Sequence, residues 1–199
     1  MSPVPPVATP IASAVPTPVG PSFTLAIQVA RPHGEIWAAL HDPALLAACV
    51  PGARLMSQQD GVLAGEMQIA LGPIVAAFSG SGRLALDEAT HRATLSGEGQ
   101  DRRSNTSLSG VATITLEATT PAVTQVALRV TYALRGPLAQ LARGPVVQAF
   151  ASGIAETVAR NLERRLAGDT ASVTPSRLSA VGLLRRILWQ RLRRWLGLG

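Results

Sequence analysis

Hydrophobic and polar positions alternate along the first segment that follows residue 21. In FTLAIQVA (23–30) every second residue is a large apolar one, the period of a β-strand with one buried face. The next stretch changes period: Ile36, Trp37 and Leu40 form a stripe at helical spacing. Asp42 and Pro43 then fit the N-cap and first turn of a second helix. The chain therefore opens with a predicted strand and two short helices.

Alternation resumes at Arg54 and continues to Leu134, broken by short turn-forming stretches such as Gly72-Pro73. Consecutive strands joined by tight turns predict an antiparallel sheet. Residues 137–166 switch to spacings of three and four, which predicts one long helix of about 45 Å. This order predicts an α+β fold in which a curved antiparallel sheet wraps around the long helix and encloses a space.

Four stretches carry a family resemblance: VARPHGEIWAALHDPALLAACVPGA, GPIVAAFSGSGRLAL, LSGEGQD and GPLAQLARGPVVQAFASGIAETVARNLERRL. The first is the most specific, because its IWxxLxDPxxLxxCVPG pattern follows the expected strand. Residues 23–166 resemble the G-subunit family of carbon-monoxide dehydrogenase. That family is a branch of the START-like (SRPBCC, helix-grip) superfamily of lipid and hydrophobic-ligand carriers. The resemblance implies a helix-grip fold.

The two ends of the chain fall outside this resemblance, and composition divides the chain into four parts. Residues 1–21 are uncharged and rich in proline, which predicts a disordered arm. It is either a plain linker or a segment that binds a partner. Residues 22–168 form the START-like domain, 169–175 a linker, and 176–199 a basic amphipathic helix.

The closing helix has an apolar stripe with arginines beside it, the pattern of helices that lie in a membrane interface. The residues predicted to bind the membrane are Val181, Leu184, Arg186, Leu188, Trp189, Leu192, Arg193, Arg194 and Trp195. This end is similar to the membrane-anchoring extension that some members of the family carry. The alternative is that the stripe packs on the protein's own domain or on a partner protein.

Net charge and cysteine content limit the function classes and the cellular compartment that can be expected for this protein. The net charge of +6 is uneven, because residues 22–168 sum to +1 and residues 169–199 to +5. A nearly neutral body disfavours nucleic-acid binding, which requires clustered cations.

Cys49 is the single cysteine, so no internal disulfide forms and a reducing compartment is expected. We expect its thiol to pack as a small apolar group. The N-terminus lacks the pattern of a secretory signal, and no apolar run is long enough to span a bilayer.

Small residues recur on strand faces that should point inward, and they predict either an internal cavity or sharp curvature of the sheet alone. With the cavity interpretation, the predicted ligand-binding residues are Phe78, Gly80, Leu84, Leu95, Gly97, Leu108, Gly110, Ala112, Ile114, Val126, Val130, Tyr132, Phe150 and Ile154. Acids and arginines fall mostly on the opposite phase or in turns, so an apolar ligand is expected. Tyr132 could offer its hydroxyl to a polar head group or serve as an ordinary core residue.

No catalytic residue is predicted. His33, His41 and His91 fall in turns or at helix starts, and Asp42 is better explained as a helix cap. The sequence has no GxSxG elbow and no glycine-rich phosphate loop. Neither a metal site nor a covalently bound cofactor is expected, since no cluster of Cys and His has ligand spacing.

Together these features predict a non-enzymatic carrier of a hydrophobic small molecule that attaches to a lipid surface through its tail. The resemblance implies a molybdenum-containing carbon-monoxide dehydrogenase or a related molybdenum hydroxylase as partner, and a lipid or respiratory quinone as cargo. It places the protein in the cytoplasm, peripheral on the inner face of the cytoplasmic membrane. The alternatives are a START-like cyclase or hydrolase, and a tethering adaptor with a filled core.

Overall fold

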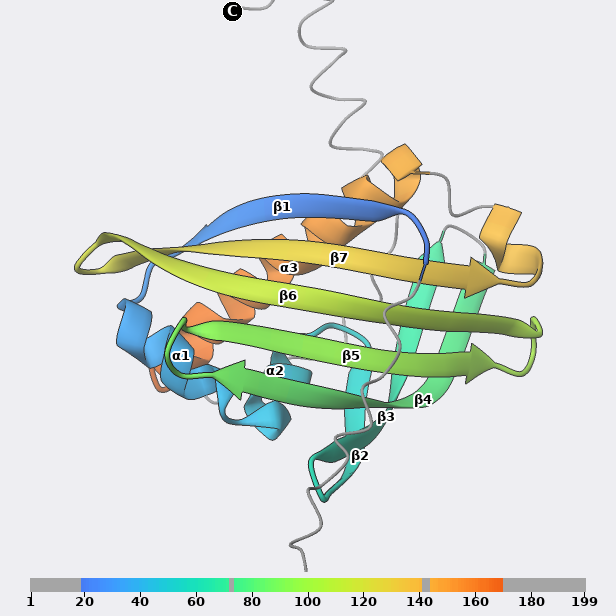
Figure 1. The fold of residues 1–199 in the computed structure, drawn as a ribbon, viewed down its shortest axis with the longest axis horizontal. Helices are drawn as coiled ribbons and strands as arrows, with labels where there is room; N and C mark the ends of the chain where they lie inside the picture. Colours follow the sequence, from blue (N-terminus) through green and yellow to red (C-terminus); the bar gives the residue numbers. More distant parts are fainter. Residues whose placement is uncertain (1–18, 72–73, 141–143, 170–199) are drawn as a thin grey trace, which may run out of the picture.

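The computed structural model describes residues 19–71, 74–140 and 144–169 of the chain (Figure 1). The elements are β1 (Ser22–Val29), α1 (His33–Leu40), α2 (Pro43–Cys49), β2 (Ala53–Gln59), β3 (Val62–Leu71), β4 (Ile74–Asp87), β5 (Arg92–Asp101), β6 (Thr106–Thr120), β7 (Val123–Arg135), η1 (Pro137–Gln140) and α3 (Gly144–Leu166). This order confirms the predicted α+β helix-grip architecture: one curved antiparallel sheet with a long helix after it.

All seven strands of the described residues belong to a single antiparallel sheet in the order β1-β7-β6-β5-β4-β3-β2. Helices α1 and α2 connect β1 to β2, which lie at opposite edges of the sheet. Helix α3 lies behind the sheet, across β1 and beside α2 (Figure 1). The β2–β3 hairpin turns at Asp60 and Gly61, both with positive φ, as a two-residue turn of type I′ requires.

The structure confirms the predicted N-terminal end of α2. The Asp42 carboxylate accepts hydrogen bonds from the backbone N–H groups of Ala44 and Leu45, each at 3.0 Å, and Pro43 occupies the first turn. Because Asp42 caps this helix, its position beside His41 is not a catalytic dyad.

The last helix differs from its prediction. Residues 137–166 were expected to form one helix, whereas the structure has a short 3₁₀ turn, η1, and then α3 from Gly144. Pro145 lies in the first turn of α3, the part of a helix in which proline is tolerated. At 23 residues, α3 is about 34 Å long rather than about 45 Å.

Two adjoining apolar clusters fill one end of the space between sheet and helices, which we call the packed end. Their buried members are Val29, Ile36, Ala39, Cys49, Ala159 and Leu162 in one cluster and Trp37, Leu40 and Ala93 in the other. The amide of Asn161 on α3 donates to the Cys49 carbonyl at 2.8 Å, which ties α3 to the end of α2. The packed end therefore joins three helices to the sheet through apolar contact and one buried hydrogen bond.

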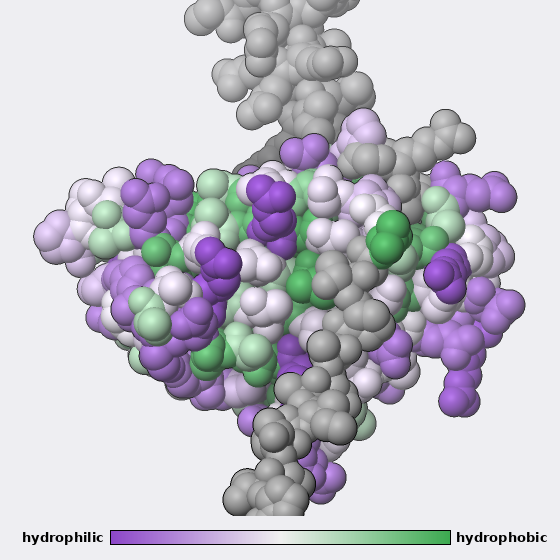
Figure 2. All heavy atoms as spheres, viewed as in Figure 1, coloured by the Kyte–Doolittle hydropathy of each residue, from purple (hydrophilic) through white to green (hydrophobic). Residues whose placement is uncertain are grey.

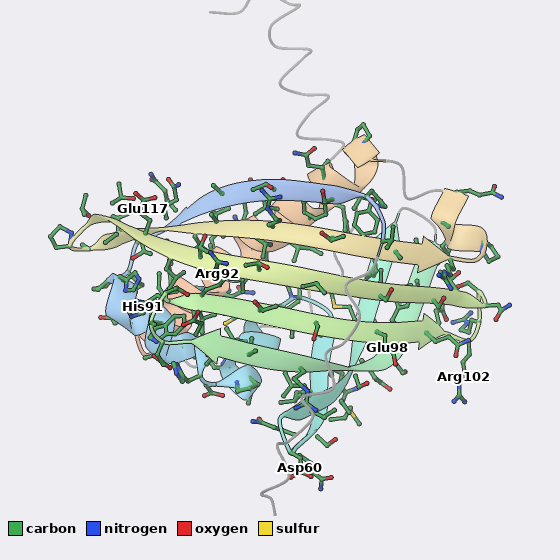
Figure 3. The ribbon with its side chains drawn as sticks, in the orientation of Figure 1. Asp60, His91, Arg92, Glu98, Arg102 and Glu117 are labelled. Carbon is green, nitrogen blue, oxygen red and sulfur yellow. The ribbon has the colours of Figure 1, made fainter. Side chains whose placement is uncertain are left out.

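The opposite face of the sheet is polar. Viewed from the side away from the helices, it shows hydrophilic and neutral residues with scattered apolar ones (Figure 2). Arg92, Glu98 and Glu117 lie along these strands, while Asp60 and Arg102 occupy hairpin tips (Figure 3). One face of the sheet is thus available to solvent, and the other forms the interior.

The terminal segments of the prediction lie largely beyond the described residues. The arm at 1–21 is described only from residue 19, and the membrane-binding residues between Val181 and Trp195 fall wholly outside the described ranges. Both therefore stay predictions. Within 19–71, 74–140 and 144–169, no helix combines the length and apolarity that crossing a membrane would require.

Candidate ligand-binding site

A cavity of about 450 Å³ occupies the end of the sheet opposite the packed end. Its wall consists of strands β2 to β7 with Ala47 of α2. Positions on the inner face of the strands are Ala53, Leu55, Leu63, Gly65, Met67, Phe78, Gly80, Gly82, Leu95, Gly97, Gly99, Leu108, Gly110, Ala112, Val130 and Tyr132. All of these residues except Tyr132 have apolar side chains or none.

Two rows of glycines cross the sheet beneath the cavity, and we call them the glycine rows. In one row, Gly65 pairs with Gly80 and Gly80 with Gly99. In the other, Gly82 pairs with Gly97 and Gly97 with Gly110. Neighbouring strands lie about 4.8 Å apart, so each row removes side chains over three adjacent strands. The cavity exists because the floor of the sheet lacks side chains at these six positions.

The glycines serve two different purposes. At Gly80 an added Cβ would collide with the Glu98 carbonyl oxygen, and at Gly82 it would lie 2.7 Å from the Ser96 carbonyl oxygen. The strands approach so closely there that no side chain fits. At Gly110, by contrast, the nearest atom to an added Cβ would be the Thr131 carbonyl oxygen at 3.4 Å, an ordinary contact. Curvature and empty space, the two interpretations open from the sequence, therefore both hold, at different positions.

Nine of the fourteen residues predicted to bind ligand lie together in the cavity wall. They are Phe78, Gly80, Leu95, Gly97, Leu108, Gly110, Ala112, Val130 and Tyr132. Leu95 lies on the inner face, borders the cavity and is 41% exposed. Whether these residues bind a ligand stays a prediction.

The other five predicted residues lie elsewhere. Leu84 and Ile114 pack on the Trp37 cluster and Val126 on the Val29 cluster, because they occupy the strand ends that the helices cover. Phe150 and Ile154, on the N-terminal half of α3, are half-buried but are not part of the cavity wall. None of the described residues of α3 lines this cavity, and whether the long helix encloses the space stays a prediction. The sheet itself curls around the cavity.

Strands β2 and β3 contribute wall residues that were not predicted, including Leu55, Leu63 and Met67. A signal for them was present. Antiparallel pairing across a turn at 72–73 matches Leu71 with Ile74, and the same register places Met67 opposite Phe78 and Leu63 opposite Gly82. Residues Arg54, Glu66 and Glu98 also border the cavity, but they are exposed and alternate with the inner positions.

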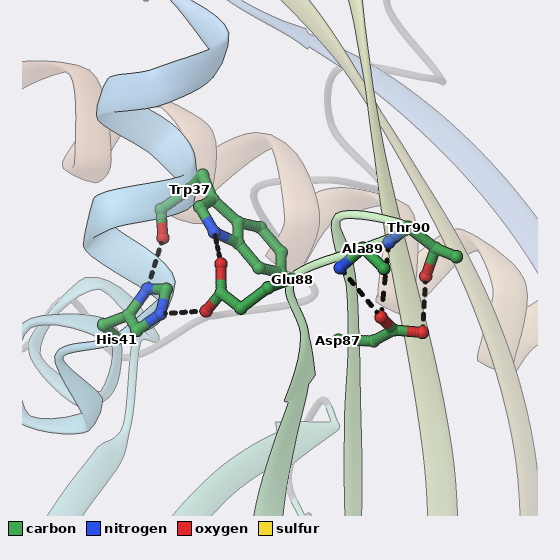
Figure 4. A network of polar contacts seen from close by, with 6 residues as sticks. All are labelled: Trp37, His41, Asp87, Glu88, Ala89 and Thr90. Carbon is green, nitrogen blue, oxygen red and sulfur yellow. Dashed lines mark hydrogen bonds and ion pairs between the residues drawn. The ribbon is translucent and has the colours of Figure 1, made fainter.

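The chain's three histidines gather at the packed end, away from the cavity. The rings of His33 and His91 are 4.8 Å apart, and the Trp37 ring lies 5.0 Å from His91 and 5.5 Å from His41. The Trp37 indole donates to Glu88 at 2.8 Å, and His41 contacts the other oxygen of Glu88 at 2.8 Å (Figure 4). This group joins α1 to the β4–β5 turn.

Hydrogen bonds shift the pKa values of His41, Glu88 and Asp87. A bond from the His41 ring to the Trp37 carbonyl, and then the bond to Glu88, raise the pKa of His41 above its usual value. The indole of Trp37 and the His41 ring lower the pKa of Glu88. In the same turn, the hydroxyl and backbone N–H of Thr90 lower the pKa of Asp87. None of these residues borders the cavity. Their hydrogen bonds hold α1 against the β4–β5 turn, and we call the His41–Glu88 pair the latch.

Cys49 is fully buried in the packed end, and burial is the main cause of the raised pKa of its thiol. A buried, protonated thiol is a poor nucleophile, so Cys49 acts as a small apolar residue. This confirms the packing role expected from the sequence.

Comparison with known proteins places the chain among others of this architecture. The family model for the G subunit of carbon monoxide dehydrogenase (CoxG) matches residues 26–167. No curated protein matches the chain at a significant level. A conserved protein from Geobacillus kaustophilus has a TM-score of 0.65 at 15% identity, covering 74% of this chain and 95% of that one.

Two further solved structures are similar. A START superfamily protein from Mycobacterium smegmatis has a TM-score of 0.51 at 14% identity, over 75% of this chain and 99% of that one. The ZhuI aromatase/cyclase from Streptomyces sp. R1128 reaches a TM-score of 0.47 at 13% identity, over 73% and 95%. At these identities the likeness concerns the fold alone.

Proposed function

The chain belongs to the CoxG family of carbon monoxide dehydrogenase, and on that premise we propose that its START-like domain is a non-enzymatic carrier of a hydrophobic ligand. The observation that carries the proposal is the 450 Å³ cavity with apolar inner positions and two glycine rows. Its volume falls within the range of about 300–1,000 Å³ that small-molecule sites occupy. A lipid or respiratory quinone suits a space of this size and polarity.

The energetics favour occupation of the cavity by an apolar group. A large side chain such as Leu95 stands 41% exposed on the inner face, and an apolar ligand would remove it from water. Each Å² of apolar surface so covered contributes about 25 cal/mol. A ligand that covered a few hundred Å² would therefore gain several kcal/mol from burial before the entropy of binding is subtracted.

The chemistry of the wall supports carriage rather than catalysis. Among the described inner positions of the cavity there is no carboxylate, imidazole, thiol or amine, and the single polar group is the Tyr132 hydroxyl. A START-like cyclase or hydrolase would need an acid, a base or a nucleophile at the reacting atoms. The three histidines that could serve lie at the packed end, in contact with Trp37 or with one another.

The tail and the family together support recruitment to a membrane. We infer that the basic stripe of residues 176–199 holds the protein reversibly at the inner face of the cytoplasmic membrane, with about 1 kcal/mol from each arginine near an anionic surface. The family is that of an accessory subunit of carbon monoxide dehydrogenase. The proposed partner is accordingly a molybdenum-containing carbon monoxide dehydrogenase or a related hydroxylase, which the carrier serves by bringing lipid or quinone to it.

Native mass spectrometry of the purified full chain tests carriage, since a carrier retains a small molecule whereas an adaptor with no cargo does not. Gly110→Phe should abolish that retention, because the new ring enters the cavity from a position with room for its Cβ. Gly34→Phe is the matched control, because a Cβ at Gly34 on α1 has no atom within 4 Å. Ligand retained by Gly110→Phe at wild-type level would overturn the cavity assignment.

Co-sedimentation with vesicles containing phosphatidylglycerol tests the tail. Deletion of 176–199 should abolish binding, and Leu188→Glu or Trp195→Glu should weaken it by placing a carboxylate on the apolar stripe. Gln190→Glu adds the same charge to the polar side and should bind far better than either. Equal sedimentation of the truncated and full-length chains would contradict the membrane role and leave the cavity proposal intact.

A further inference from the structure

A polar groove of about 540 Å³ lies on the outer face of the sheet, on the reverse of the strands that form the cavity floor. We call it the outer groove. Two rows of polar side chains cross β4, β5, β6 and β7 along it. The pairs of the first row are Ser81 with Glu98, Glu98 with Ser109, and Ser109 with Ala133. The pairs of the second row are Ser79 with Gln100, Gln100 with Ser107, and Ser107 with Arg135.

The outer groove is rich in hydrogen-bond donors and has almost no net charge. Its four serines, Gln100 and Arg135 each present an O–H or N–H group, while Glu98 offers only acceptors. Within the described ranges these side chains make no hydrogen bond or ion pair with another protein group, so their donors are available to a ligand. The single arginine and the single glutamate cancel in charge. An uncharged ligand with many acceptor oxygens therefore suits this groove.

The described part of the chain begins at the rim of the outer groove. The backbone N–H of Tyr132 donates to the Pro21 carbonyl at 3.1 Å, which extends the pairing of β1 with β7. At Gly20 the chain bends and crosses β7 (Figure 1), so closely that an added Cβ would meet the Tyr132 carbonyl oxygen and lie 3.6 Å from the Ala133 Cα. Ala133 ends the first polar row, and Val19 is fully exposed. Residues 1–18 are therefore attached at the β7 end of the groove.

The composition of residues 1–18 complements the outer groove. They are uncharged and include six prolines. Proline has no N–H and favours the polyproline II conformation, in which the backbone carbonyl groups make no internal hydrogen bonds. Such a segment offers more acceptors than donors, whereas the groove offers more donors than acceptors. The fixed φ of proline also reduces the conformational entropy that is lost on binding.

The span of the outer groove sets the length of the segment that fills it. From β7 to β4 the distance is about 14 Å, because neighbouring strands lie about 4.8 Å apart. A polyproline II segment advances about 3.1 Å per residue. Five residues are therefore enough, and the five that precede Val19 are AVPTP (14–18).

We propose that residues 14–18 lie in the outer groove as a strap across β7, β6, β5 and β4, with their carbonyl oxygens accepting hydrogen bonds from the two polar rows. The strap gives this part of the sheet a packed layer, which its inner face lacks because of the glycine rows. It assigns a binding place within the protein to part of the arm. The strap lies on the opposite face from the cavity, so it does not depend on whether the cavity binds a ligand.

Disulfide trapping in the full chain tests the strap with a matched pair of positions. Ser81 lies three strands from Ala133, about 14 Å away, and Arg129 lies four residues from Ala133 along β7, about 13 Å away. Both are exposed on the same face, so an undocked arm reaches them equally. Ala14→Cys with Ser81→Cys should form an intramolecular disulfide at least about tenfold faster than Ala14→Cys with Arg129→Cys, because docking raises the effective concentration at one position only. The native Cys49 does not compete, since it is fully buried.

Three results would overturn the proposal. Equal rates for the two pairs would show that the arm is not docked, and a faster reaction at Arg129 would place it elsewhere. The third result comes from mixing the single variants Ala14→Cys and Ser81→Cys: a disulfide between copies that forms as fast as the one within a chain would mean that the groove takes the arm of a second copy. Circular dichroism checks that each cysteine variant retains the fold.

The contribution of proline is tested in the same assay. Pro16→Gly with Pro18→Gly, added to the Ser81 pair and to the Arg129 pair, should reduce the ratio of the two rates to below about threefold, because glycine loses more conformational freedom on docking. A ratio unchanged by these substitutions would contradict a strap that is held in polyproline II geometry.

Discussion

The packed end and the cavity end of this protein are built on the same strands, yet their inner positions are filled in opposite ways. At the packed end, Val29, Ile36 and Leu162 interlock between sheet and helices, each at most 6% exposed. At the cavity end, the corresponding layer of the sheet is made of glycine rows and Leu95 remains partly exposed. The contrast indicates that the two ends have different roles: the packed end stabilises the fold, and the cavity end leaves an internal space.

The largest difference between the ends should appear when a side chain is cut back in each. Ile36→Ala removes a fully enclosed side chain and should lower the free energy of unfolding by about 2–5 kcal/mol. Leu95→Ala shortens a side chain that already faces empty space, so the loss should stay below about 1 kcal/mol. Urea denaturation measures both. Comparable losses would mean that the cavity end carries as much stability as the packed end.

Within the cavity floor, a second pair of variants distinguishes curvature from space. In Gly80→Ala the new Cβ would meet the Glu98 carbonyl oxygen and lie 2.5 Å from the Gly99 Cα, which should destabilise the fold by about 1–3 kcal/mol. Gly99→Ala places its Cβ 3.5 Å from the Ser79 carbonyl oxygen and should change stability by less than about 0.5 kcal/mol. Thermal unfolding of the two proteins checks this order, and its reversal would show that the strands are not pinned at Gly80.

A smaller effect is expected at the buried hydrogen bond of the packed end. Asn161→Leu leaves the Cys49 carbonyl without its partner and should cost about 1–2 kcal/mol in the free energy of unfolding. The fraction of protein that retains a small molecule in native mass spectrometry should change less than about twofold, because neither residue borders the cavity and distant sites act almost independently. Loss of that retention in a folded Asn161→Leu protein would show that the two ends are coupled.

The smallest effect concerns pH. The pKa of His41 is raised in the folded state, so its contribution to stability is complete below the unfolded value, near 6.5, and is lost as pH rises through the folded pKa. The melting temperature of His41→Gln should therefore lie furthest below the wild type near pH 5.5 and converge with it above pH 8. Glu88→Gln should reproduce this pattern, since Glu88 accepts the bond. Parallel melting curves at all pH values would exclude the pair as a pH-dependent latch.

Much of the fold could be predicted because local signals agree with it. The alternation of 23–30, the cap at Asp42 and the strand run from Arg54 to Leu134 each depend on residues close in sequence. The resemblance to the CoxG family is confirmed by a match over residues 26–167. The length of α3 was missed because the helical spacing of apolar residues begins at 137–140, where the structure has a 3₁₀ turn in place of an α-helix.

The site was predicted only in part for a different reason. Inner and outer phases can be derived from alternation, and nine residues of the wall were placed in this way. How far along a strand the helices reach cannot be derived from alternation, so Leu84, Ile114 and Val126 were assigned to the cavity although α1 and α3 cover that part of the sheet. The curl of the sheet around its own cavity arises from strand approaches at Gly80 and Gly82, which no single strand pattern reveals.

The two kinds of glycine in the floor bear on how proteins with this architecture could diversify. Gly80 and Gly82 are fixed by the approach of neighbouring backbone, so replacing them endangers folding. A Cβ added at Gly99 or Gly110 would make only ordinary van der Waals contacts. Alanine, serine or valine at these positions would therefore change the shape of the cavity and leave the hydrogen bonds of the β-sheet intact. Single substitutions at these two positions can therefore change which ligand a related protein prefers, with little effect on the stability of its fold.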